Sequence, residues 1–108
     1  MAEKQLTASD SAEAKPDDAF WRVADTFIAS ANEQAVEVDR GVVSAGFAYA
    51  SARFNAFVIA SQCGSKEAFE AEKAAAIEYF VTQYKLALTE NVADYQTNFD
   101  TYINNASQ

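Results

Sequence analysis

The sequence predicts an all-α fold, a helical bundle of three helices in which the C-terminal helix is the longest. Two observations indicate this class. Apolar residues recur every three or four positions through three long segments, as they do on the packed face of a helix. Pro16 and Gly64 stand where predicted helices begin and end, which are positions that these residues favour. A chain of 108 residues suits one domain, and we place it at residues 16–108.

The N-terminal tail, residues 1–15, is rich in Ala, Ser, Asp, Glu and Lys. Apart from Met1, Leu6 is its only large apolar residue. Because such a segment has too little apolar surface to offset the entropy lost on folding, we expect it to be disordered.

The first helix is expected over residues 16–38. Asp17 and Asp18 lie near its start, where the helix dipole favours negative charge. One apolar stripe follows at helical spacing: Phe20, Ala24, Phe27, Ala31 and Ala35. The stripe predicts a helix with one packed face, which ends before a turn at residues 39–41.

The second helix is expected over residues 43–62, with Gly64 as its C-terminal cap. Its two opposite faces are both apolar but differ in size. One face is bulky, with Val43, Phe47, Phe54 and Phe57, and the other is small, with Ala45, Ala48, Ala52 and Ala56. A helix that is apolar all round is usually covered on more than one side.

The third helix is expected to start after the N-cap Ser65, and neither Gly nor Pro interrupts residues 66–103. It would span roughly 57 Å, against about 30 Å for each of the others. A three-helix bundle therefore leaves its far end uncovered, as a candidate interface formed by Val92, Tyr95, Phe99, Tyr102 and Ile103. Alternatively, the helix breaks near residue 90, among weak helix formers, and folds back to give four helices.

The composition is acidic, with a formal net charge of −8 and a pI near 4.3. It lacks the basic surface typical of nucleic-acid-binding proteins. Cys63 is the single cysteine, so no disulfide forms within the chain. Arg53 and Asn55 interrupt the most apolar stretch, residues 41–61, and no signal sequence is evident. We therefore expect a cytoplasmic protein that binds neither membranes nor nucleic acid.

Most catalytic patterns are excluded by composition. The chain has no His, which rules out Ser-His-Asp triads and His-bearing metal sites, and three glycines do not make a phosphate-binding loop. Cys63 stands at a helix C-terminus, where the dipole disfavours a thiolate. The glutamates at 67, 70 and 72 are spread around the helix, as on a solvated face. We predict no catalytic residue, cofactor or metal ligand, and favour a non-enzymatic protein.

Arg53 and Asn55 lie about 160° apart around their helix, so they do not line one small pocket. Asn55 is placed to hydrogen-bond a neighbouring helix. Arg53 needs an anionic partner if its stem is buried, which Asp25, Glu78 or Asp94 would supply within the chain or across a dimer. A structural ion pair, an anion or partner contact and an exposed, unpaired Arg53 all stay open.

Three strings carry a family resemblance: A-D-x-F-I-x-x-A-N at residues 24–32, A-R-F-N-A-F at 52–57 and Y-F-V-x-Q-Y at 79–84. Through them, residues 19–102 resemble a family of small bacterial proteins catalogued as domain of unknown function 3144. The resemblance implies no activity, cofactor or substrate, and no functional residue carries over. The polar positions inside the strings, Asn32, Arg53 and Asn55, are the candidate ligand or partner contacts.

The leading functional hypothesis is a non-enzymatic helical protein that forms a homo-oligomer or binds a protein partner. One alternative is a binder of a small ligand or anion, or a minor enzyme, that uses Arg53 with a nearby acid. A further alternative is an acidic mimic of DNA that inhibits a DNA-binding enzyme.

Overall fold

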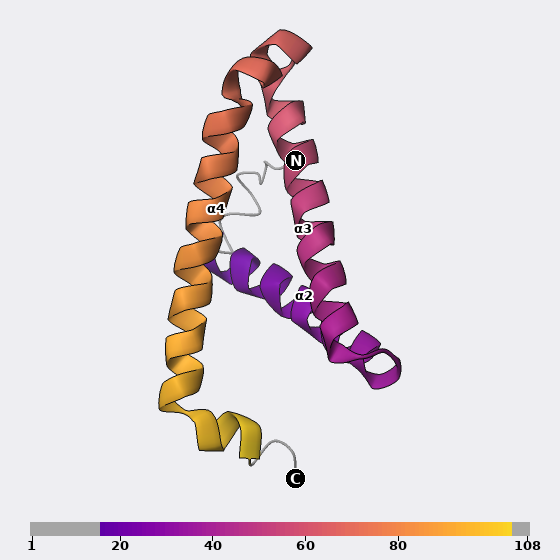
Figure 1. Cartoon of the computed structure of the whole chain (residues 1–108), viewed down its shortest axis with the longest axis vertical. Coiled ribbons are helices and arrows are strands. Elements are labelled where there is room, and N and C mark those ends of the chain that lie inside the picture. Colours follow the sequence, from indigo (N-terminus) through magenta and orange to yellow (C-terminus); the bar gives the residue numbers. More distant parts are fainter. Residues whose placement is uncertain (1–15, 105–108) are drawn as a thin grey trace. The chain divides into compact units, whose positions relative to one another are not determined.

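The computed structural model describes residues 16–104, which form three α-helices and a π-helical turn (Figure 1). The helices are α2 (Pro16–Glu37), α3 (Arg40–Cys63) and α4 (Lys66–Thr97), and the π-helical turn is η1 (Asp100–Asn104). The predicted all-α class with a long C-terminal helix is confirmed. The predicted tail, residues 1–15, lies outside the described residues.

The chain divides into two units, Met1–Arg53 and Phe54–Gln108. The division falls inside α3, so residues 40–53 of this helix belong with α2 and residues 54–63 belong with α4. The single domain expected over residues 16–108 stays a prediction.

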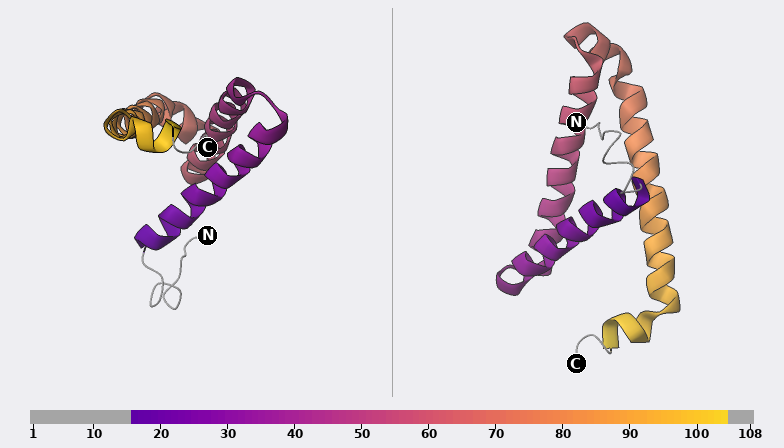
Figure 2. Two further views of the ribbon diagram at one scale, coloured as in Figure 1. Left: turned by 90° about the horizontal axis from the view of Figure 1, so that it is seen from below. Right: turned by 180° about the vertical axis from the view of Figure 1, so that it is seen from behind.

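In the first unit, Val38 and Asp39 join α2 to α3, and Asp39 forms two hydrogen bonds to the start of α3. Its carboxylate Oδ2 accepts a hydrogen bond from the backbone N–H of Gly41 at 2.8 Å. Its carbonyl oxygen accepts one from the backbone N–H of Val43 at 3.1 Å. Asp39 is therefore the N-cap of α3, and the turn is shorter than expected because Arg40 and Gly41 are already helical. From this turn, α2 and residues 40–53 diverge as the two arms of a V (Figure 2).

In the second unit, two predicted caps are confirmed between α3 and α4. Gly64 has a positive φ of 82°, a conformation that suits glycine after a helix. The Ser65 Oγ accepts a hydrogen bond from the backbone N–H of Ala68 at 3.1 Å, which satisfies one of the free donors at the start of α4.

The alternative of a break near residue 90 is wrong in position, because α4 continues to Thr97 and the chain turns at Asn98. α4 continues through residues 89–91 to Thr97, and the side-chain amide of Asn91 donates to the carbonyl oxygen of Ala87 at 2.8 Å without interrupting it. The Asn98 amide donates to both the carbonyl oxygen and the carboxylate Oδ1 of Asp94, at 3.2 and 2.9 Å. Such side-chain bonds compete with the helical backbone pattern, and the chain turns into η1 beyond them.

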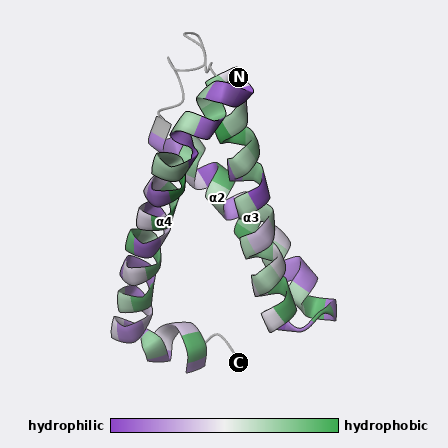
Figure 3. Ribbon diagram, turned by 45° about the horizontal axis from the view of Figure 1, so that its top comes forward, coloured by the Kyte–Doolittle hydropathy of each residue, from purple (hydrophilic) through white to green (hydrophobic). Residues whose placement is uncertain are grey.

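Packing within each unit is thin, since no apolar residue of the part described is buried. The apolar residues with intermediate burial are mostly small, for example Ala24, Ala31, Ala35 and Val43 in the first unit and Val58, Ile59, Ala68 and Ala76 in the second. Figure 3 shows hydrophobic positions distributed along all three helices. The structure therefore positions apolar side chains on accessible surfaces.

Candidate association surfaces

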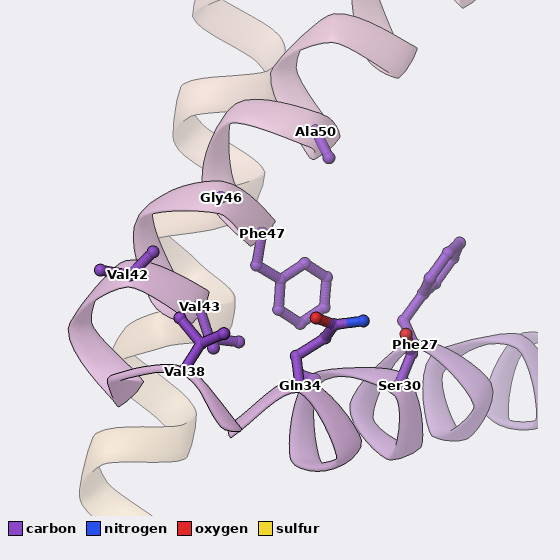
Figure 4. A pocket seen from close by; sticks show the side chains of 10 residues that line it. Phe27, Ser30, Gln34, Val38, Val42, Val43, Gly46, Phe47 and Ala50 are labelled. Carbon is purple, nitrogen blue, oxygen red and sulfur yellow. The ribbon is translucent and has the colours of Figure 1, made fainter. Parts of the chain in front are cut away.

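An apolar groove lies in the first unit, between the arms of the V formed by α2 and α3 (Figure 4). Its volume is about 420 Å³, and its lining residues are Phe27, Ser30, Ala31, Gln34, Val38, Val42, Val43, Gly46, Phe47 and Ala50. Ser30 and Gln34 supply the only polar side chains among them. We call this feature the α2–α3 groove.

The groove follows from helical spacing on both arms. Phe27, Ala31 and Gln34 recur at three or four residues on α2, and Val38 follows just after its end. Val43, Phe47 and Ala50 recur in the same way on α3. The rings of Phe27 and Phe47 have centroids 6.3 Å apart with planes inclined at 49°. They remain 56% and 41% exposed, so the contact between the arms covers only part of each ring.

Gly46 leaves the groove open at its middle. A Cβ atom built at this position meets no atom within 4 Å. The arms of the V therefore do not pack tightly at Gly46, and there is room for atoms from another molecule.

The second surface is the C-terminal surface, Val92, Tyr95, Phe99, Tyr102 and Ile103, which sequence analysis proposed as an interface. Because the chain turns at Asn98, these residues follow α4 and then η1 instead of one straight helix. Tyr95 and Phe99 are 49% and 53% exposed. Tyr102 is half-buried, with its ring centroid 4.6 Å from that of Tyr95. Whether another molecule binds this surface stays a prediction.

A hydrogen-bonded cluster organises the turn beneath the C-terminal surface. The Tyr102 hydroxyl donates to Oδ2 of Asp94 at 3.0 Å, while the Asn98 amide donates to Oδ1 at 2.9 Å. The hydrogen bond to the carboxylate, together with its charge, raises the pKa of Tyr102 above its usual value, because ionised Tyr102 would lose the bond and repel Asp94.

The three predicted contact residues line neither the α2–α3 groove nor a hollow between residues 58–63 of α3 and α4. Asn32 and Arg53 are exposed, and Asn55 is half-buried. Within the described part of the first unit, Arg53 has no ion pair with Asp25, and its pairing with Glu78 or Asp94 stays a prediction. A contact from Arg53 to another molecule therefore stays a prediction.

The described residues contain no group of three or more Cys, Asp and Glu side chains that could hold a metal ion. Cys63 is a free thiol of intermediate burial at the end of α3. By length and composition, α3 is apolar enough to cross a membrane. Core helices of globular proteins have a similar composition, but they are mostly buried, whereas none of this stretch of α3 is buried.

Comparison with known proteins gives a family. The model of the family described as "Protein of unknown function (DUF3144)" matches residues 20–96. The chain belongs to the DUF3144 family. The matched residues include the whole α2–α3 groove, whereas Phe99, Tyr102 and Ile103 lie beyond them. The resemblance found in the sequence is thereby confirmed.

A solved structure also matches this DUF3144 protein. It is the NMR structure of a protein from Shewanella sp, which is 37% identical, with a TM-score of 0.65. The match covers 82% of this chain and 93% of the other. No curated protein matches. These comparisons establish the family and the fold, and neither of them assigns a biochemical activity.

Sequence analysis did not single out the α2–α3 groove as a site. It assigned Phe27 and Phe47 to packed faces, and it did not consider Ser30 or Gln34. One available signal was the helical spacing that places Gln34 between Phe27 and Val38 on an apolar face. That the face remains open depends on the angle between α2 and α3, which the spacing of residues does not specify.

Proposed function

We propose that this DUF3144 protein is a non-enzymatic helical protein whose function is association, as a homo-oligomer or with a protein partner. The observation that carries the proposal is the absence of any buried apolar residue among those described, combined with large exposed aromatic side chains on all three helices. Apolar patches larger than a few hundred Å² are typical of surfaces that bind other molecules.

Two further properties belong to the same proposal. We place the protein in the cytoplasm, because a single cysteine in an acidic chain suits a reducing compartment. Its net charge of −8 disfavours binding to phosphate-rich nucleic acid and anionic lipid. The alternative of a binder at Arg53 gains no support from the two hollows described, since neither is lined by Arg53.

The direct test is the solution mass of the full chain by sedimentation equilibrium from low to high micromolar concentration. We expect a reversible shift from 11.8 kDa toward a discrete multiple of that mass. A monomer at every concentration would contradict self-association. In that case, a pull-down with cross-linking must recover a specific partner, or the proposal fails altogether.

A further inference from the structure

We infer that the α2–α3 groove is a docking site for a second copy of this chain, with α2 of each copy facing α3 of the other. This inference rests on the proposed function and names its partner and one of its surfaces. It is carried by the opposite charges of the two arms and by the apolar area that they leave exposed.

The two arms of the V carry opposite charge. α2 has five acidic residues and one basic residue, Arg22. α3 has Arg40 and Arg53 and no acidic residue, and both arginines fall in the first unit. A two-fold axis that relates two such hairpins forms the same contact twice, each time between the acidic α2 of one copy and the basic α3 of the other. Such complementarity favours this arrangement over one that pairs like arms.

The charged side chains stand beside the apolar lining. Glu33 follows Ser30 by three residues, and Glu37 follows Gln34 by three. Arg53 follows Ala50 by three residues. Residues at this spacing are neighbours on a helix surface, so the carboxylates and the guanidinium border the groove while its centre remains apolar. An apolar centre with a polar rim is the usual composition of a protein interface.

The apolar surface exposed in and beside the α2–α3 groove is large enough to form a small dimer interface. On α2, Phe20 and Val23 continue the face that carries Phe27. The exposed fractions of these three residues and of Val42 and Phe47 on α3 lie between 41% and 61%. If a whole aromatic side chain offers about 200 Å², these five residues supply on the order of 500 Å² per copy. Two copies would bury roughly 1,000 Å², where specific interfaces begin. An interface at this lower end of the size range is typical of transient complexes, so we expect a reversible dimer and not a permanent one.

Two charge-swapped variants test the arrangement. The first carries Glu33→Lys and Glu37→Lys on α2, and the second carries Arg40→Glu and Arg53→Glu on α3. Glu37→Lys adds a base to the last turn of α2 and Arg40→Glu adds an acid to the first turn of α3, which the helix dipoles favour. Circular dichroism checks that each variant keeps the wild-type helix content.

We expect each variant alone to raise the dimer dissociation constant at least tenfold by sedimentation equilibrium, because like charges then face each other. An equimolar mixture should return to within about threefold of wild type, since the basic α2 of one variant meets the acidic α3 of the other. The α2 variant is less acidic overall, so a general repulsion effect predicts stronger association, opposite to our expectation. Glu70→Lys with Glu72→Lys makes the same charge change on α4, beyond its first turn and outside the groove, and serves as the matched control.

The outcomes separate this inference from the proposed function. If wild type dimerises and both variants dimerise equally well, the second copy docks elsewhere and only the inference fails. If both variants lose the dimer and the mixture does not recover it, the charges act within one chain, and the inference is again overturned. If wild type remains a monomer at all concentrations, the inference fails together with homo-oligomeric function.

Discussion

Tyr102 and Asp94 are hydrogen-bonded across the end of α4, with the phenol hydroxyl 3.0 Å from the carboxylate Oδ2. The bond spans eight residues and crosses the point where α4 gives way to η1. It holds Tyr102 against Tyr95, whose ring centroid is 4.6 Å away. The carboxylate of Asp94 therefore links α4 to η1 at the C-terminal surface.

The first prediction concerns the titration of Tyr102. Its pKa is raised by the hydrogen bond to Asp94 and by the charge of that carboxylate. The folded protein thus holds this proton more tightly than the unfolded chain, so the stabilisation is complete below the ordinary tyrosine pKa of 10.0 and is lost as pH rises through the raised pKa. In a spectrophotometric titration, Tyr102→Phe should remove tyrosinate absorbance that the wild type gains above pH 10.0. A Tyr102→Phe curve that loses absorbance only below pH 10.0 would contradict the assignment.

The second prediction concerns the turn itself. Asp94→Ala removes the acceptor of both the Tyr102 hydroxyl and the Asn98 amide. Because these bonds are solvent-exposed, we expect little change in global stability, below about 1 kcal/mol, but faster backbone amide exchange across residues 98–104. Glu90→Ala, one turn earlier on α4 and outside the cluster, is the control. Unchanged exchange in Asp94→Ala would mean that the turn does not depend on this carboxylate.

The third prediction concerns the C-terminal surface. Tyr95→Ser combined with Phe99→Ser removes two exposed rings. If this surface takes part in association, the dissociation constant should rise tenfold or more, since buried aromatic residues dominate binding energy at most interfaces. Gln96→Ser, in the same turn of α4, should bind as wild type. A double variant with wild-type affinity would exclude the surface from the interface.

The fourth prediction concerns the cap of α4. Ser65→Ala removes the acceptor for the Ala68 N–H and should lower the free energy of unfolding by about 1 kcal/mol. Ser65→Asp keeps an acceptor at the N-cap and should retain most of the stability. Urea unfolding followed by circular dichroism distinguishes these variants, and equal midpoints for Ser65→Ala and wild type would show that the cap contributes nothing.

The fifth prediction contrasts two glycines in α3 and its cap. Gly64 has a φ of 82°, so Gly64→Ala should destabilise the protein by about 1 kcal/mol. Gly46 lies inside α3, and its Cβ position is open. Gly46→Ala should therefore stabilise the monomer by up to about 1 kcal/mol. Where a second copy fills the groove, the same methyl should weaken dimerisation. Thermal unfolding at low and high protein concentration separates the two effects.

Local sequence determined the helices of this protein. Pro16 with its two following aspartates, Gly64 and Ser65 each act through bonds or dihedral angles within a few residues, so the start of α2, the end of α3 and the start of α4 were predictable. The long uninterrupted stripe of α4 was predictable for the same reason. The break was misplaced to residue 90 because helix propensities near Thr89 and Asn91 are weak preferences. The side-chain bonds from Asn98 and Tyr102 to Asp94 mark the end of the helix instead.

Tertiary structure alone decided which apolar faces stay open. Periodicity marked Phe27 and Phe47 as packing residues, and their rings do approach each other. The divergence of α2 from α3 leaves the α2–α3 groove between them, and this divergence depends on the geometry of the turn at Asp39. An amphipathic pattern indicates that an apolar face must be buried. It does not specify whether the same chain or another molecule buries it, because the free energy gained by removing apolar surface from water is similar in both cases.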